Sequence, residues 1–323
     1  MQYQHNNKKK IVFDNKYILQ NKIGEGGFSN VFQLKIKKRK KDQVPLCIKV
    51  FHRGDTNCDN EKILQEVNKE IFLSQTCNHN NLIKIFTKGE LKKNKYFFNY
   101  IIMEHHSCDL FDFFSECEDF STKQVIDIGG QIGSALLALH KNNYLHLDVK
   151  PENILFNKKF NTWILCDLSS CINYNDSKAL QKFDPAVTVQ FAAPELITEN
   201  VSTLLSPQTD VYALGCVLYL CLCEMDFIPD RIAEDYDGIL IFQQIQSKHR
   251  HHQLVLKAGP FNKFGIALNN EEICCQYTKW YSLYKDKMSN DIIDLLRCSL
   301  ECNPELRYNS EQFLDHINKL EKL

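Results

Sequence analysis

One short segment near the middle of the chain combines side chains suited to phosphate chemistry. His146-Leu-Asp-Val-Lys-Pro-Glu-Asn153 holds a carboxylate, an ammonium and an amide close together. Asp148 can accept a proton from an incoming hydroxyl, Lys150 can neutralise a phosphoryl oxygen, and Asn153 can offer a carbonyl oxygen to Mg²⁺. A second acid, Asp167, follows nineteen residues after Asp148 at the end of an apolar run, a natural place for a metal ligand.

A glycine-rich turn near the N-terminus could approach a phosphate group. The segment Gly24-Glu-Gly-Gly-Phe-Ser-Asn-Val31 lies between two strand-like runs. Gly24 and Gly26 have no Cβ, so their backbone N–H groups can come close to phosphate oxygens. Because the turn lies between strands and does not begin a helix, it does not fit a dinucleotide-binding or Walker loop. Most glycine-rich hairpins bind nothing, so this turn alone is weak evidence.

A lysine and a glutamate occupy positions where a charge is costly. Lys49 ends an apolar run, and an unpaired buried ammonium is unfavourable. Glu70 falls within the apolar stripe of an expected helix over Asn60–Thr76, where a carboxylate needs a counter-charge. Pairing of the two explains both positions. Taken alone, these residues fit equally well as two chains that extend their charges into water.

The pattern of the elements changes at about residue 106. Before it, runs rich in β-branched and aromatic residues predict strands over Tyr17–Gly24, Asn30–Lys37, Pro45–Phe51, Leu82–Thr87 and Tyr96–Met103. After it, apolar periodicity predicts helices over Ser121–Asn142 (N-cap Ser121), Pro207–Cys223, Asn290–Leu300 and Ser310–Leu320. Because Pro207–Cys223 is apolar all round, we expect it to be buried in the centre of a lobe.

Length and composition narrow the possible classes. The 323 residues suffice for one large domain or two lobes without disulfide or metal staples. With 39 Lys plus Arg against 40 Asp plus Glu, the net charge is −1, which argues against nucleic acid as the main partner. The longest apolar run, Val211–Cys223, is shorter than the ~20 residues of a membrane span. The first ten residues lack the apolar core of a secretory signal.

The fourteen cysteines favour free thiols in a reducing compartment. Most stand in apolar runs and no Cys-x-x-Cys pair occurs, so a zinc site or disulfide framework is disfavoured. We therefore expect a cytoplasmic protein. The basic run 35–41 could act as a nuclear address, although a solvated hairpin tip is the favoured interpretation. His249, His251 and His252 are interpreted as a wet basic loop because no acid or cysteine stands at ligand spacing.

In order and spacing, these motifs resemble those of the eukaryotic protein kinases. Three further segments fit: Thr188-Val-Gln-Phe-Ala-Ala-Pro-Glu195, Asp210-Val-Tyr-Ala-Leu-Gly215 and Asn303-Pro-Glu-Leu-Arg307. The resemblance implies an α+β, two-lobed protein kinase fold with one domain over about residues 17–320. Residues 1–16 would be an extension, 17–106 a small β-rich N-lobe with one regulatory helix, and 107–323 a larger, mainly helical C-lobe.

The resemblance also implies roles for individual residues. Lys49 would hold the α- and β-phosphates of ATP and pair with Glu70, Asp148 would be the base beside Lys150, and Mg²⁺ would be held by Asn153 and Asp167. The nucleotide would meet Gly24, Glu25, Gly26, Gly27, Val31, Cys47, Met103, Glu104, His106 and Leu155. Among these, Met103 would be the gatekeeper, 104–106 the hinge whose backbone meets adenine, and Cys47 and Leu155 the residues that sandwich the base.

The family resemblance further implies which residues form ion pairs and which reaction the protein catalyses. Glu66 is the runner-up partner of Lys49, and Glu195 with Arg307 would form the buried ion pair of the C-lobe. Lys150 and Thr188 look like the serine/threonine branch, and the segment ending in Glu195 disfavours a small-molecule kinase. The expected function is ATP- and Mg²⁺-dependent transfer of the γ-phosphoryl group to protein Ser or Thr hydroxyls, by a monomer.

Several positions depart from the family pattern. Leu147 replaces the usual Arg, Leu168 and Ser169 replace Phe and Gly after Asp167, and Ser74 occupies a position that is usually apolar. Ser29 replaces the third glycine and Cys47 replaces Ala. Ser74 and Ser169 could loosen the active arrangement.

These departures keep open an alternative function. The chain would then be a pseudokinase that binds nucleotide or acts as a scaffold. Leu147 removes one usual anchor for a phosphate on the activation segment, so we expect activity without phosphorylation there. Residues 225–288 match no family segment and leave the substrate undefined.

Overall fold

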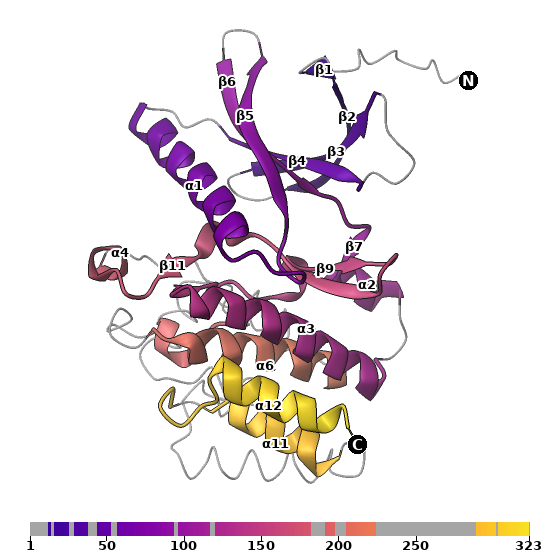
Figure 1. The fold of residues 1–323 in the computed structure, drawn as a ribbon, viewed down its shortest axis with the longest axis vertical. Coiled ribbons are helices and arrows are strands. Elements are labelled where there is room, and N and C mark those ends of the chain that lie inside the picture. The colour runs from indigo at the N-terminus through magenta and orange to yellow at the C-terminus, as the bar shows by residue number, and fades with distance from the viewer. Residues whose placement is uncertain are drawn as a thin grey trace, which may run out of the picture. The chain divides into compact units, whose positions relative to one another are not determined.

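A computed structural model describes residues 12–13, 16–25, 29–37, 44–52, 57–93, 96–116, 120–181, 191–197, 205–223, 289–301 and 303–322 (Figure 1). The chain divides into two compact units, each described by itself below. The first comprises residues 1–78, 82–107 and 167–169, and the second residues 79–81, 108–166 and 170–323. The change of unit at residue 107 lies next to the lobe boundary expected at residue 106. The histidine cluster and the unmatched stretch 225–288 lie outside the described residues.

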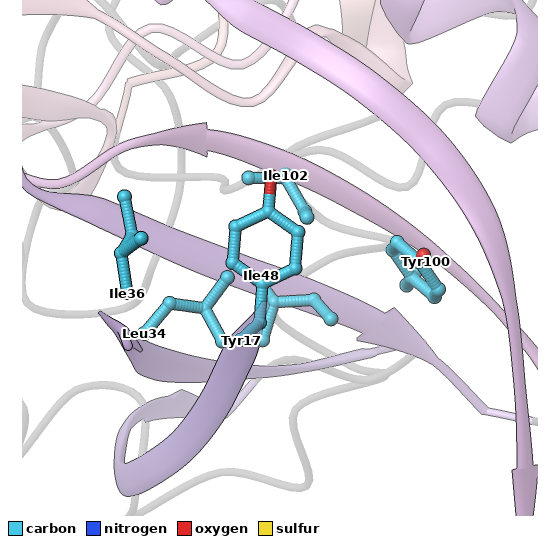
Figure 2. Packing of buried hydrophobic residues seen from close by; sticks show 6 residues of the cluster. All are labelled: Tyr17, Leu34, Ile36, Ile48, Tyr100 and Ile102. Atoms are coloured by element: carbon cyan, nitrogen blue, oxygen red, sulfur yellow. The ribbon is translucent and has the colours of Figure 1, made fainter. Parts of the chain in front are cut away.

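The first unit contains an antiparallel sheet with the strand order β1-β2-β3-β4-β6-β5. Its strands are β1 (Val12–Phe13), β2 (Tyr17–Glu25), β3 (Ser29–Ile36), β4 (Leu46–Phe51), β5 (Ile85–Lys93) and β6 (Tyr96–Glu104). Successive side chains of a strand point to opposite faces, so each strand can contribute to two separate clusters. One cluster is made by Tyr17, Leu34, Ile36, Ile48, Tyr100 and Ile102 (Figure 2).

Helix α1 (Asn57–Thr76) covers the other face of this sheet. Its residue Val67 packs with Phe51, Ile85 and Ile101, and Ile63 and Ile71 lie against the same cluster. Ile101 and Ile102 therefore serve opposite faces, as the strand period of two requires. The predicted helix over 60–76 is confirmed, and it begins three residues earlier than expected.

The predicted strand over Leu82–Thr87 is wrong in its bounds. Strand β5 begins at Ile85 and continues to Lys93 through a polar, lysine-rich sequence. Pairing with β6 extends it, with Gly89 opposite Tyr100 and Lys93 opposite Tyr96. As the edge strand of the sheet, β5 can carry charged residues along a water-exposed side, so its sequence lacks the apolar signature of a buried strand.

The second unit is mainly helical. Within the described residues, its helices are α2 (Leu110–Glu116), α3 (Thr122–Lys141), α4 (Ser177–Gln181), α6 (Pro207–Cys223), α11 (Asn290–Ser299) and α12 (Ser310–Leu320). A small sheet has the order β10 (Thr162–Leu165), β9 (Ile154–Asn157), β7 (Cys108–Asp109), and β8 (Tyr144–Leu145) pairs with β11 (Ile172–Asn173). Short 3₁₀ helices span Pro151–Asn153, Leu168–Ser170 and Pro194–Ile197. Among the described helices, none is both long and apolar enough to cross a membrane.

Helix α3 forms the centre of this unit and packs against α6 and α12. Ser121 caps it as predicted, in a reciprocal capping box with Gln124. The bounds predicted for α6 and α12 are confirmed, and the all-round apolar α6 is buried along most of its length. The close approach of α3 to its neighbours depends on glycine. A Cβ at Gly129 would lie 2.9 Å from Ile317 Cδ1 and 3.1 Å from Leu218 Cδ1.

We predict that Gly129→Val lowers the free energy of unfolding by about 2 kcal/mol, because the new side chain overpacks the contact of α3 with α6 and α12. Gly130→Ala is the matched control, since its Cβ would be 3.3 Å from Ile317 Cγ2 and 3.4 Å from Glu321 Oε1. Its cost should be offset by the ~1 kcal/mol helix preference of alanine over glycine. Urea unfolding measures both. Equal stability of the two variants would contradict this packing.

Candidate active site

Lys49 lies between two carboxylates in the first unit. Its Nζ is 2.8 Å from Glu70 Oε1 and 2.9 Å from Asp167 Oδ1. The Glu70 side chain is 2% exposed, that of Lys49 10% and that of Asp167 36%. The predicted pairing with Glu70 is confirmed, whereas the runner-up Glu66 pairs with Lys69 instead, at 2.8 Å.

The sequence periods of strand and helix bring these charges together. On β4, Lys49 alternates with Ile48 and therefore faces the side of the sheet that α1 covers, together with Phe51. On α1, Glu70 follows Val67 by three residues and so shares its buried face. Lysine and glutamate thus meet inside an otherwise apolar contact.

The two buried charges shift the titration of each other. Burial alone lowers the pKa of Lys49, but the carboxylates of Glu70 and Asp167 raise it by more, so the net shift is upward. Burial raises the pKa of Glu70, and the Lys49 ammonium offsets part of that effect. Lys49 therefore remains positively charged at neutral pH, and the arrangement offers a fixed cation next to a carboxylate.

Asp167 is held in a specific orientation within the first unit. Its backbone has a positive φ of 59°, which is unfavourable for a residue other than glycine. Ser169 Oγ donates to Asp167 Oδ1 at 2.8 Å, and Lys69 Nζ donates to the Ser169 carbonyl. These contacts do not support the expectation that Ser169 loosens the arrangement, because glycine at this position would remove the hydroxyl donor. Leu168 is fully buried.

Ser74 links α1 to the chain that leads into β5. Its Oγ donates to the Ile83 carbonyl at 2.7 Å and accepts from the Ile85 N–H at 2.9 Å. The side chain is buried, so both backbone groups would lose their partner without it. The expectation that Ser74 loosens the active arrangement is therefore not supported. It replaces apolar stacking by two hydrogen bonds.

Several of the residues expected to meet the nucleotide lie on strands of the first unit. Gly24, near the end of β2, is paired with Val31 on β3, and Glu25 follows it. Cys47 on β4 is paired with Met103 on β6, is 3% exposed and donates its S–H to the Glu104 carbonyl at 3.4 Å. Burial, assisted by Glu104, raises the pKa of the Cys47 thiol to about 12. Gly26 and Gly27 lie outside the described residues.

The expected hinge is anchored by its own polar groups. The Glu104 carboxylate accepts from the Lys84 backbone N–H at 3.0 Å and lies 3.6 Å from His106 Nε2. The N–H of His105 donates to the Pro45 carbonyl at 2.9 Å. Sequence reasoning missed this use of the Glu104 side chain, because no local pattern connects it with Lys84.

In the second unit, Asp148, Lys150 and Asn153 form one cluster. Lys150 Nζ lies 2.8 Å from Asp148 Oδ2. Asn153 Nδ2 donates to the Asp148 carbonyl at 2.7 Å and to Oδ2 at 2.8 Å. With its amide nitrogen used in this way, Asn153 has its amide oxygen left as the atom suited to a metal. Leu155 is on the neighbouring strand β9 and half-buried.

A buried aspartate orients the backbone just before Asp148. Asp210 of α6 accepts from the N–H of His146 at 2.7 Å and from that of Leu147 at 2.8 Å. His140 Nε2 is 2.8 Å from Asp210 Oδ2, and its Nδ1 is 3.0 Å from Ser310 Oγ. These bonds hold Leu147 at a positive φ of 64°.

The charge of Asp210 is stabilised although it is fully buried. Burial alone raises the pKa of Asp210, but the bond from His140 and the nearby His146 lower it by more. Sequence analysis assigned no role to His140, Asp210 or Ser310. One sequence feature could have indicated this role. Asp210 is an acid in the first turn of an otherwise apolar helix, and a buried acid requires a partner.

The predicted ion pair of Glu195 with Arg307 is confirmed. Two bonds, of 2.7 and 3.0 Å, join the guanidinium to the carboxylate, and both side chains are buried. Thr209 donates to the same carboxylate at 2.8 Å, and the Arg307 guanidinium lies over the Tyr212 ring. Thr188 lies outside the described residues.

Taken by itself, each unit offers an oxygen donor of a kind that suits a hard divalent cation. Asp167 offers a half-exposed carboxylate, and Asn153 offers an amide oxygen oriented by Asp148. Mg²⁺ is usually bound by one or two carboxylates together with phosphate and water. Lys49 supplies a permanent cation suited to phosphate oxygens.

Comparison with known proteins gives consistent matches. A family model described as protein kinase domain matches residues 17–317. The chain is 27% identical over 298 residues to the serine/threonine-protein kinase DCLK3 of Mus musculus. That match covers 91% of this chain and 32% of the mouse protein. It is 23% identical over 336 residues to the DNA damage response protein kinase DUN1 of Saccharomyces cerevisiae. That match covers 96% of this chain and 56% of the yeast protein. This chain thus spans only 32% of the length of the mouse relative and 56% of that of the yeast relative.

We predict that Ser74→Ala lowers the free energy of unfolding by about 2 kcal/mol, because it leaves a buried N–H and a buried carbonyl without their partner. Gln75→Ala, at the exposed neighbouring position of α1, is the control and should change stability by less than about 0.5 kcal/mol. Urea unfolding measures both variants. A Ser74→Ala protein as stable as the parent would show that these bonds do not hold α1.

Proposed function

Because the chain belongs to the eukaryotic protein kinase family, we propose that it is an active serine/threonine kinase. It would use ATP and Mg²⁺ and transfer the γ-phosphoryl group to Ser or Thr hydroxyls of protein substrates. The observation that carries the proposal is the ion cluster of Lys49 with Glu70 and Asp167. A lysine held by two carboxylates is suited to phosphate binding, which a scaffold that binds no nucleotide does not require.

In this proposal the first unit binds and orients the phosphates. Phosphoryl transfer asks little covalent chemistry of the protein, so positioning and charge stabilisation supply most of the rate. Lys49 would bind phosphate oxygens, and Glu70 would hold its ammonium in place. Asp167 of this unit would be a ligand of Mg²⁺, which when bound would neutralise charge on the phosphate oxygens, and family resemblance gives Asn153 the same role. Gly24 and Val31 would lie over the nucleotide.

The second unit would handle the acceptor hydroxyl. Asp148 would accept its proton, since the carboxylate is oriented by Asn153 at 2.8 Å. Lys150, also 2.8 Å from Asp148, would stabilise the transferred phosphoryl group. Asp210 would act through the backbone N–H groups of His146 and Leu147, which precede the base.

The choice of Ser/Thr as acceptor rests on sequence and on relatives. Lys150 is the residue typical of that branch, and the mouse relative carries the name serine/threonine-protein kinase. Free thiols at the described cysteines suit the proposed cytoplasmic location. A nucleotide-binding pseudokinase is the competing function, and the departures at Leu147, Leu168 and Ser169 are the reason to test it.

We predict that Asp148→Asn lowers kcat on a Ser/Thr peptide library by at least about 100-fold, because the amide cannot take the proton. Asp176→Asn is the control, since this exposed acid serves only the turn before α4. Phosphopeptide formation is measured by mass spectrometry. Parent protein that binds ATP without turnover would support the pseudokinase, and equal activity of Asp148→Asn would remove Asp148 as the base.

We predict that Asp167→Ala abolishes the Mg²⁺-dependent rise of the melting temperature with ATP, because the carboxylate ligand is lost. The readout is a thermal melt with ATP in the presence of Mg²⁺ or EDTA. Asp176→Asn again serves as control and should keep the full rise. An Asp167→Ala protein that retained the parent's Mg²⁺-dependent rise would exclude Asp167 as a ligand.

A further inference from the structure

Three donors converge on one oxygen of Asp167. Lys49 Nζ lies 2.9 Å from Oδ1, Ser169 Oγ donates to it at 2.8 Å, and the Ser169 N–H approaches it at 3.4 Å. The hydroxyl departs from the protein kinase pattern, which has glycine where Ser169 stands. The Asp167 carboxylate, the proposed metal ligand, is therefore held by a side chain at a position where glycine could donate only its backbone N–H.

A second contact fixes the backbone that carries this hydroxyl. Lys69 of α1 donates from Nζ to the Ser169 carbonyl. The same ammonium lies 2.8 Å from Glu66 Oε2, one turn earlier on the helix, which holds the lysine in place. Because Lys69 directly precedes Glu70, helix α1 contacts the segment 167–169 through two successive residues. One acts through Lys49 on the Asp167 carboxylate and the other directly on Ser169.

We propose that Ser169 and Lys69 are positioning residues that prepare Asp167 for the metal-bound nucleotide. The inference rests on the proposed kinase function. Mg²⁺ demands nearly ideal octahedral geometry, so a carboxylate that is already oriented binds it with a smaller ordering cost. The Ser169 hydroxyl limits rotation of the carboxylate, and Lys69 keeps the hydroxyl in reach of it.

A local turn preference alone accounts for the bond between Ser169 and Asp167 but not for the contact from Lys69. Serine two residues after aspartate often bonds to it in turns, and such a bond would need no helix. The contact from Lys69 comes from an element distant in sequence, and it aims at the residue that holds Asp167. The two contacts together predict coupled effects: either substitution weakens metal binding, and the second adds little to the first.

The test measures the Mg²⁺ concentration that gives half of the ATP-induced rise in melting temperature, using the full chain. Ser169→Ala and Lys69→Met should each raise this concentration about tenfold, and the double variant should raise it little more. Ser169→Thr keeps the hydroxyl and should restore the parent value. Ser170→Ala and Lys62→Met are matched controls, since both residues lie on the same elements and have no part in these contacts. In turnover assays, the KM for Mg²⁺ should rise while kcat at saturating Mg²⁺ stays near the parent value.

The outcomes separate this inference from the proposed function. If the parent shows a Mg²⁺-dependent rise and Ser169→Ala requires no more Mg²⁺, the positioning role is overturned while the kinase proposal stands. If the parent shows no such rise, the kinase proposal and this inference both fail. Melting without nucleotide identifies a variant that does not fold. Should Ser169→Ala be unfolded, an unchanged Mg²⁺ requirement of Lys69→Met overturns the inference by itself.

Discussion

A single ammonium group shared by two carboxylates organises the first unit. Lys49 lies inside an apolar contact, and it is tolerated there because Glu70 and Asp167 lie within 3 Å of its Nζ. Removing Lys49 would leave the buried Glu70 carboxylate without its counter-charge, so this ammonium holds strand β4, helix α1 and Asp167 together. The upward shift in the pKa of Lys49 keeps the cation available at neutral pH. In the proposed function, stability and phosphate binding would therefore depend on the same contact.

The second unit uses a buried anion in a comparable way. Asp210 is fully buried and accepts bonds from the backbone of residues 146 and 147 and from His140. Its partners keep it ionised, and its carboxylate oxygens hold the backbone N–H groups of the two residues before Asp148. Glu195 with Arg307 is the second buried pair of this unit, and it joins a 3₁₀ turn to the segment before α12. Among the described residues, these buried charges have partners that also hold a neighbouring segment in place.

The sequence alone was sufficient to predict those features of the fold and site that depend on a short-range pattern. The ends of α6 and α12, the Ser121 cap and the pairings of Lys49 and Arg307 were predictable from periodicity, capping chemistry, the cost of buried charge and family resemblance. The extent of β5 was not predictable, because its pairing with β6 extends the strand through polar residues at the edge of the sheet. The contacts of Ser74, of the Ser169 carbonyl and of His140 were not predictable either, because these partners lie on segments that only the folded chain brings near. Departures from a family pattern therefore looked like losses, although two of them add hydrogen bonds.

The central claim is that Lys49 and Glu70 act as one unit in phosphate binding, and a double-mutant cycle tests it most directly. The measured quantity is kcat/KM for ATP in the parent, Lys49→Met, Glu70→Gln and the double variant, with each protein shown to be folded by its melting curve. We expect each single substitution to lower kcat/KM by at least about 100-fold and the double variant to be scarcely worse, because residues that act together are strongly non-additive. Additive losses, or near-parent activity of either single variant, would contradict the account.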